Sequence, residues 1–100
     1  MAFNERYKIN DQSIANAPRQ NGVYILYKDN TIIYIGRTDN QNTITARLQS
    51  HKRGDEGSCT QQATSYSREP MDNPSKKAEE LLIAYKIKHE KLPLCNERIG

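Results

Sequence analysis

Two tyrosines, an arginine and a histidine stand at spacings that could serve phosphate chemistry. Tyr24 and Tyr34 lie in two neighbouring apolar runs, and a pair of phenol hydroxyls can orient a phosphate or a water molecule. Such a phenol can also accept a proton if a nearby cation lowers its pKa from about 10. Arg47 and His51 are four residues apart and would project from one face of a helix. Arginine binds phosphate through two parallel donors, and histidine transfers protons near neutral pH.

A carboxylate further along the chain could hold a metal ion. Mg²⁺ and Mn²⁺ take one or two carboxylates together with phosphate oxygens of the substrate. Glu79 stands early in a long helical pattern, beside its apolar stripe, whereas its neighbour Glu80 points farther round the helix. Helical phase therefore favours Glu79 as the ligand and leaves Glu80 as the alternative.

Each of these residues also has an ordinary structural explanation. Tyrosine is common on half-buried strands, and an exposed Arg/His pair is usually part of a solvated helix face. Glu79 could be a solvated carboxylate beside Lys76 and Lys77. The functional interpretation requires the helix with Arg47 and His51 to pack on the tyrosine face of the strands.

A β-hairpin over residues 22–28 and 31–36 is the clearest local structure. Both runs are rich in β-branched and aromatic residues, and Asp29-Asn30 suits a tight turn. Alternation predicts one face with Val23, Ile25 and Tyr27 and the other with Tyr24 and Leu26. In the second run it predicts Ile33 and Ile35 on one face and Ile32 and Tyr34 on the other.

The remaining elements are predicted from caps and breakers. A helix begins at Asn42 or Thr43 and ends at Gly54, followed by a loop over residues 54–60. Residues 61–69 supply a third strand, and a long helix runs from Ser75 to a stop before Pro93. Upstream, Ile9, Ile14 and Ala15 indicate a short helix or a packed N-terminal arm.

Composition predicts one small domain. The chain has 100 residues, and its net charge of +3 permits a polyanionic partner without proving one. No apolar run approaches the length of a membrane span, and residues 1–10 lack a signal-peptide core, so we expect a soluble, cytoplasmic protein.

The cysteine content favours thiols over a metal site. Cys59 and Cys95 are far apart in a chain without an export signal, so reduced thiols are expected. A zinc site of these cysteines with His51 and His89 is conceivable, but no C-x-x-C or H-x-x-x-H spacing supports it.

The order of these motifs resembles the GIY-YIG nuclease superfamily. Gly22-Val23-Tyr24 and Tyr34-Ile35-Gly36 resemble the paired motif that names the family, with valine in place of the first isoleucine. The family's Arg and His or Tyr correspond to Arg47 and His51, its metal-binding glutamate to Glu79, and its closing Pro-x-x-Asn to residues 93–96. The sequence departs from compact members through an insertion at residues 39–42 and a longer stretch between Glu79 and Asn96.

The resemblance implies a fold and an activity. The fold is α/β of the α+β type, with a small central three-stranded antiparallel β-sheet flanked by helices. Residues 1–21 would form an arm or short helix packed on the domain, residues 22–96 the nuclease domain, and residues 97–100 a tail. The activity is a divalent-metal-dependent endonuclease that hydrolyses DNA phosphodiester bonds with Mg²⁺ or Mn²⁺.

The resemblance also implies a role for each site residue. Tyr24 is the general-base candidate, aided by Tyr34 and His51, and its pKa would be lowered by the metal and Arg47 together. Arg47 stabilises the phosphate, and Arg37 is an additional phosphate contact. Glu79 holds the metal and Asn96 shapes the site.

The sequence leaves open which partners the protein has and whether it is active. Modules of this family usually take specificity from a second DNA-binding domain, so a separate domain or subunit is an expected partner besides DNA, and no membrane partner is expected. The alternative to the nuclease is a catalytically inactive nucleic-acid-binding module of the same fold. A plain interaction domain would have no reason for the ordered set of motifs.

Overall fold

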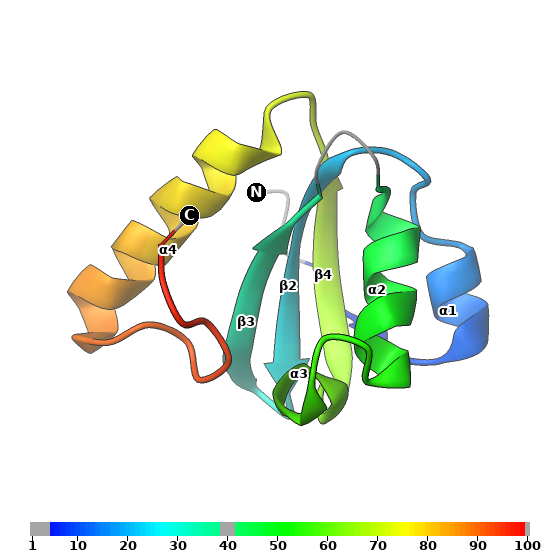
Figure 1. Cartoon of the computed structure of the whole chain (residues 1–100), viewed down its shortest axis with the longest axis horizontal. Helices are drawn as coiled ribbons and strands as arrows, with labels where there is room; N and C mark the ends of the chain where they lie inside the picture. Colours follow the sequence, from blue (N-terminus) through cyan, green and yellow to red (C-terminus); the bar gives the residue numbers. More distant parts are fainter. Residues whose placement is uncertain (1–4, 39–41, 100) are drawn as a thin grey trace.

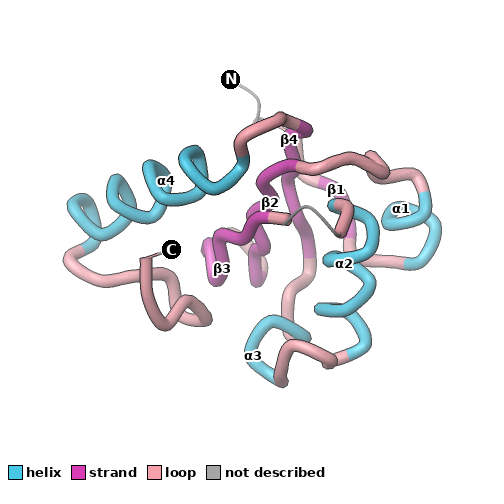
Figure 2. Tube along the Cα trace, turned by 45° about the horizontal axis from the view of Figure 1, so that its top comes forward, coloured by secondary structure: helices cyan, strands magenta, loops and turns pink. Residues whose placement is uncertain are grey.

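A four-stranded antiparallel sheet with helices on both faces forms the protein, in a computed structural model that describes residues 5–38 and 42–99. The strand order is β1-β4-β2-β3, with bounds Tyr7–Lys8, Ser65–Pro70, Gly22–Lys28 and Thr31–Arg37 respectively. The helices are α1 (Asp11–Ala15), α2 (Ile44–Arg53), α3 (Ser58–Gln61) and α4 (Pro74–His89). Figure 1 shows α4 on one face of the sheet and α1 and α2 on the other, and Figure 2 shows the same layers from above.

The sheet has one strand more than the sequence predicted. β2 and β3 form the expected hairpin, in which Lys28 pairs with Thr31 and Asp29 takes a positive φ of 56°. β4, the predicted third strand, pairs with the other edge of β2. The added strand β1 pairs only with β4, and it has two residues, which is too short for alternation to indicate a strand. The predicted short helix near Ile14 is confirmed as α1.

A β-bulge changes the faces of β3. Leu26 pairs with Tyr34, and the next residue of β2 pairs with Ile32, so Ile33 is the extra residue. The prediction that Ile33 and Ile35 share a face is therefore wrong: Ile33 packs on the α1–α2 side and Ile35 on the α4 side. The prediction that Ile32 and Tyr34 share a face is wrong for the same reason, because Ile32 packs on the α4 side. Tyr34 stays on the side of Tyr24, as predicted.

The sheet separates two apolar cores, one on each of its faces. The α1–α2 side buries Ile14, Ala17, Tyr24, Leu26, Ile33, Ile44, Leu48 and Tyr66. The α4 side buries Val23, Ile25, Tyr27, Ile35, Ala78 and Leu82. A hairpin that is apolar on both faces is stable only when both are covered, and the two helix layers provide that cover.

The caps of α2 fix the helix that carries Arg47 and His51. The Thr43 side chain accepts a hydrogen bond from the backbone N–H of Ala46, and Gly54 ends the helix in the left-handed region at φ 85°. Both caps were predicted. At the start of α4, Pro74 occupies the first turn, where its missing N–H has no helical partner to lose.

The segment after α2 differs from the prediction in two ways. Residues 58–61 form the short helix α3, which covers the end of the expected loop and the first residue of the predicted strand, and Cys59 of α3 is disulfide-bonded to Cys95. The expectation of reduced thiols is therefore wrong: the two cysteines are distant in sequence but adjacent in the fold. Because both sulfurs are in this bond, neither cysteine is available for a zinc site with His51 and His89.

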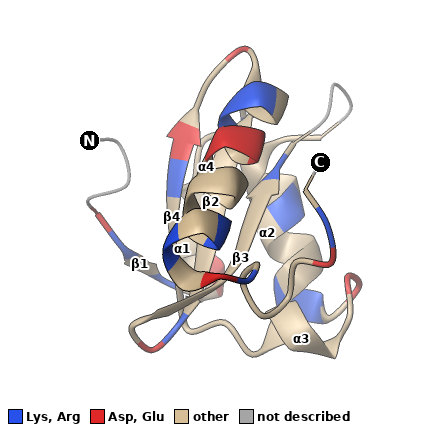
Figure 3. Cartoon of the chain, turned by 90° about the vertical axis from the view of Figure 1, so that its left-hand side faces the viewer, with Lys and Arg blue, Asp and Glu red and all other residues tan. Residues whose placement is uncertain are grey.

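The surface carries charges of both signs. Figure 3 shows Lys and Arg alternating with Asp and Glu along α4, without a continuous band of one sign. Within the described residues, no helix is long and apolar enough to cross a membrane.

Candidate active site

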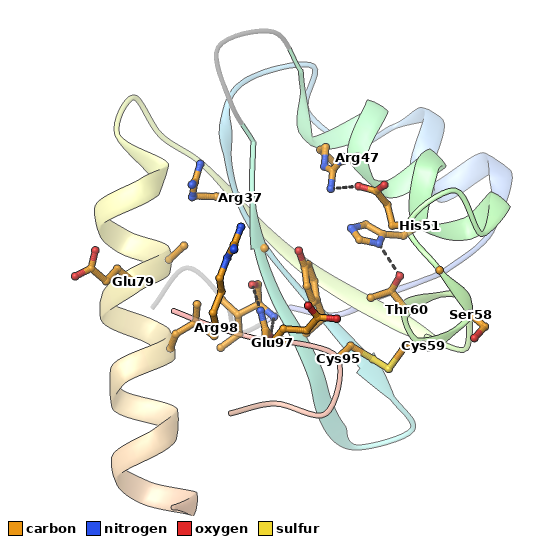
Figure 4. A pocket seen from close by; sticks show the side chains of 18 residues that line it. Arg37, Arg47, His51, Ser58, Cys59, Thr60, Glu79, Cys95, Glu97 and Arg98 are labelled. Atoms are coloured by element: carbon orange, nitrogen blue, oxygen red, sulfur yellow. Dashed lines mark hydrogen bonds and ion pairs between the residues drawn. A yellow bond between two sulfur atoms is a disulfide. The ribbon is translucent and has the colours of Figure 1, made fainter. Parts of the chain in front are cut away.

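A pocket of about 730 Å³ crosses the open edge of the sheet at β3, between the helix layers. Its walls come from β3, α2, the α2–α3 connection, α3, α4 and the C-terminal segment (Figure 4). Six predicted site residues line it: Tyr34, Arg37, Arg47, His51, Glu79 and Asn96. The seventh, Tyr24, is fully buried and contacts the pocket through His51.

Gly36 makes room for the two tyrosines. It pairs with Tyr24 across the hairpin, and a Cβ atom there would lie 2.6 Å from the Tyr24 hydroxyl oxygen and 2.5 Å from a Tyr34 ring carbon. The ring centroids of the tyrosines are 6.2 Å apart. The second glycine of the paired motif is therefore a packing requirement, because any larger residue would push the rings out of place.

His51 connects the tyrosines to α3. Its Nε2 lies 2.8 Å from the Tyr24 hydroxyl and its Nδ1 lies 2.8 Å from the Thr60 hydroxyl, and all three side chains are buried. The His51 ring also contacts the Tyr34 ring, with centroids 5.1 Å apart. The i,i+4 spacing with Arg47 thus points both side chains into the pocket, as predicted.

Burial keeps both His51 and Tyr24 uncharged near neutral pH. Burial and the nearby Arg47 lower the pKa of His51 to about 4, against a smaller opposing effect of Glu56. Burial and the adjacent Tyr34 raise the pKa of Tyr24 above its ordinary value, and Arg47 opposes this only in part. Near neutral pH the cluster therefore holds a neutral imidazole hydrogen-bonded to a protonated phenol.

Arg47 is already paired in the pocket. Its guanidinium forms an ion pair with Glu56, and both side chains are partly exposed. Burial alone would lower the pKa of Arg47, but Tyr24 and Glu56 outweigh it and raise the pKa above the ordinary value. A phosphate entering this pocket must share or replace the Glu56 carboxylate.

Glu79 lies on the opposite wall of the pocket. Figure 4 shows it on α4, across the pocket from Arg47 and His51, with its carboxylate directed away from them. It is exposed and makes no hydrogen bond or ion pair within the described part of the chain. Glu80 is also exposed but lies outside the pocket lining. The pocket lining thus includes Glu79, the glutamate that helical phase favours, and not Glu80.

Asn96 binds the backbone of the edge strand. Its Oδ1 accepts a hydrogen bond from the N–H of Ile35 (2.9 Å) and its Nδ2 donates to the C=O of the same residue (3.0 Å). Cys95 adds a backbone bond to Ile33 at 2.7 Å. The side chain thus holds the C-terminal segment against β3, which agrees with a role in shaping the site.

One carboxylate at the pocket wall, that of Glu79, is available to a divalent cation. Glu79 presents an exposed carboxylate, and a magnesium ion needs few protein ligands when phosphate and water supply the rest. Among residues 5–38 and 42–99 there is no cluster of three or more acidic, histidine or cysteine side chains that could hold a metal without such help.

Sequence reasoning missed two residues of the site, Glu56 and Thr60. Both follow α2 in a stretch predicted as loop, and neither belongs to a motif. The only available signal was their position after the helix that carries His51, which specifies no contact.

The sequence matches the family model of the GIY-YIG catalytic domain over residues 20–93. No curated protein matches it. Among solved structures, the fold is similar to the GIY-YIG N-terminal endonuclease domain of UvrC from Thermotoga maritima. A point mutant of that domain, bound to its catalytic divalent cation, has a TM-score of 0.59 and 23% identity, covering 87% of this chain and 93% of that chain. The same domain bound to magnesium has a TM-score of 0.58 and 23% identity, covering 85% and 92%. The chain belongs to the GIY-YIG catalytic-domain family.

Proposed function

We propose that the protein is a divalent-metal-dependent endonuclease that hydrolyses DNA phosphodiester bonds. The observation that carries this proposal is the 2.8 Å contact between the Tyr24 hydroxyl and Nε2 of a neutral His51, beside Arg47 in an open pocket. A proton acceptor and a phosphate-binding cation are the two groups that water attack on phosphorus needs first.

Tyr24 and His51 would act together as the base. Arg47 alone does not bring the pKa of Tyr24 below its ordinary value, because burial outweighs it, so a preformed phenolate is not the base. A neutral imidazole at 2.8 Å provides a second acceptor. Tyr24 is buried behind His51 in the free protein, so substrate binding would have to open the pocket to its hydroxyl. As the water oxygen bonds to phosphorus, one water proton would then pass to the Tyr24 oxygen while the Tyr24 proton passes to Nε2 of His51. The bond from phosphorus to the leaving oxygen then breaks, and His51 is left as an imidazolium.

The remaining residues would bind and orient the substrate. Arg47 donates to the non-bridging phosphate oxygens once Glu56 is displaced, and Arg37, exposed at the pocket rim, contacts a neighbouring phosphate. Asn96 holds β3 in place. Glu79 would hold Mg²⁺ or Mn²⁺, and the bound cation supplies charge stabilisation to the phosphate and leaving oxygens. The similar UvrC domains are themselves bound to a catalytic divalent cation, magnesium in one of them, which supports this choice.

Cleavage assays test the proposal with a matched pair of tyrosine variants. Plasmid, single-stranded and branched DNA are incubated with the protein and Mg²⁺, Mn²⁺ or EDTA. We expect cleavage that EDTA abolishes and that Tyr24→Phe reduces by about 100-fold or more, the range of a positioned base. Tyr27→Phe is the control, because Tyr27 lies on the other face of the sheet, hydrogen-bonded to Ser67, and should cleave normally.

Two results would contradict the proposal. Equal cleavage by the Tyr24→Phe and Tyr27→Phe proteins would exclude Tyr24 from the reaction. Salt-sensitive binding of all three DNAs without cleavage would instead establish the inactive binding module.

A further inference from the structure

Thr60 has one hydrogen-bond partner for its side chain, and that partner is His51. The Thr60 hydroxyl lies 2.8 Å from Nδ1, its exposed fraction is 4%, and no other described group contacts this oxygen at hydrogen-bond distance. α3, which carries Thr60, is fixed next to this contact by the Cys59–Cys95 disulfide. The hydroxyl is therefore held against one nitrogen of the imidazole.

A neutral imidazole carries its proton on one nitrogen, and the chemistry depends on which. If Nε2 held the proton, it could not accept another from Tyr24. If Nδ1 holds it, Nε2 is a free acceptor facing the Tyr24 hydroxyl. The Tyr24 oxygen lies beside Arg47, which can only donate, so the Tyr24 proton is directed to Nε2.

We propose that Thr60 is a positioning residue: its hydroxyl oxygen accepts the Nδ1–H of His51 and thereby keeps Nε2 unprotonated toward Tyr24. The same hydrogen bond persists when Nε2 gains a proton, because Nδ1 is a donor in both states. Proton transfer then requires no rotation of the ring. The tautomer assignment is a property of the free protein, whereas its effect on turnover rests on the proposed nuclease activity.

The groups that face His51 come from every element around it. They are Arg47 on its own helix, Tyr24 and Tyr34 on the strands, Thr60 on α3 and Glu56 in the connection between α2 and α3. Thr60 is the one of these that contacts Nδ1. Substituting it therefore alters the tautomer while the charged groups around the ring stay unchanged.

Nitrogen NMR of the two histidines reads the tautomer directly. Protonated and unprotonated ring nitrogens give well-separated ¹⁵N shifts, and the chain has only His51 and the exposed His89, which serves as an internal reference. At pH 7 we expect His51 with a protonated Nδ1 and an unprotonated Nε2 in the wild type and in Thr60→Ser. Thr60→Val keeps the shape and loses the acceptor, so the Nε2–H form should become detectable there.

Kinetics provide the second measurement. Thr60→Val should lower kcat by about 10-fold or more, part of the contribution of a positioned base, and Thr60→Ser should restore it. KM should not change, because the hydrogen bond of the Thr60 side chain is made to His51 and not to Arg47, the proposed phosphate ligand. Amide spectra of both variants verify that the fold is intact.

The outcomes separate this inference from the proposed function. A wild-type His51 protonated on Nε2, or an unchanged tautomer in Thr60→Val, would overturn the role of Thr60 even if the protein cleaves DNA. The expected tautomers in a protein that cleaves nothing would uphold the role of Thr60 in positioning His51 and refute the nuclease.

Discussion

His51 is held as a neutral base, four residues after Arg47 in the sequence. Its ordinary pKa would leave it partly charged at mildly acidic pH, but burial and Arg47 lower the pKa to about 4. His51 therefore stays neutral, and able to accept a proton, at mildly acidic pH values at which a solvent-exposed histidine is already protonated. The lowered pKa of His51 also makes the folded state less stable at low pH.

The free energy of unfolding should therefore depend on pH through His51. Unfolded His51 binds a proton below about pH 6.5, whereas folded His51 does so only near pH 4, so the unfolded state gains protons as the pH falls between them. Stability should fall by up to about 3 kcal/mol from pH 6.5 to pH 4. Urea unfolding of the wild type, His51→Gln and His89→Gln measures this. A slope that disappears in His89→Gln, or persists in His51→Gln, would contradict it.

Glu56 is an anion at the place where the substrate phosphate would bind in the proposed reaction. Its carboxylate pairs with Arg47, and the neighbouring Asp55 pairs with Arg53 outside the pocket. Glu56→Gln should tighten binding of duplex DNA in EDTA by about 2- to 5-fold, the size of a partly exposed ion pair. Asp55→Asn makes the same charge change in the same loop and should have a smaller effect. Equal effects of the two variants would assign the gain to net charge alone.

At this scale the sequence predicts side-chain types better than their contacts. Tyr24, Arg47 and His51 could be found because motif order and helical spacing specify them. Thr60 and Glu56 could not, because their contacts depend on how the α2–α3 connection folds back over α2. The raised pKa of Tyr24 could not be predicted from the sequence either, because its main cause is burial, which depends on the tertiary structure.

Among the elements, α3 and the C-terminal segment are joined by the disulfide. Each cysteine precedes a residue of the site: Cys59 precedes Thr60, and Cys95 precedes Asn96. The bond therefore holds two walls of the pocket at a fixed distance. Local sequence signals predicted the hairpin, the caps of α2 and the start of α4. They could not predict β1, the bulge at Ile33 or this disulfide, because these depend on pairing between distant parts of the chain.

Breaking the disulfide should loosen both walls. The two cysteines are 36 residues apart, and closing a loop of that size restricts the unfolded chain by roughly 2–4 kcal/mol. A Cys59→Ser/Cys95→Ser variant should lose stability of that order, and amide exchange at Ile35, which is held by Asn96, should accelerate. Added reductant should reproduce both changes in the wild type and leave the variant unaffected. Stability unchanged by reductant would show that the bond does not constrain the chain.

On the scale of the whole molecule, the site lies where the two helix layers meet at the edge strand β3. The α2 side supplies the base and Arg47, the α4 side supplies Glu79, and β3 with Asn96 forms the floor between them. Neither layer holds the full set. The proposed chemistry therefore depends on substrate bridging the pocket from Arg47 to Glu79, with the metal ion at the α4 wall.

The adjacent glutamates of α4 test this arrangement most directly. Glu79 lines the pocket and Glu80 does not, although both are exposed carboxylates on the same helix turn. Cleavage of DNA by Glu79→Ala and Glu80→Ala is measured across a Mg²⁺ titration. We expect Glu79→Ala to lose cleavage by about 100-fold or more, roughly the effect of a missing charge-stabilising contact, while Glu80→Ala retains it. Equal cleavage by the two variants, with the same Mg²⁺ dependence, would exclude Glu79 as the metal ligand.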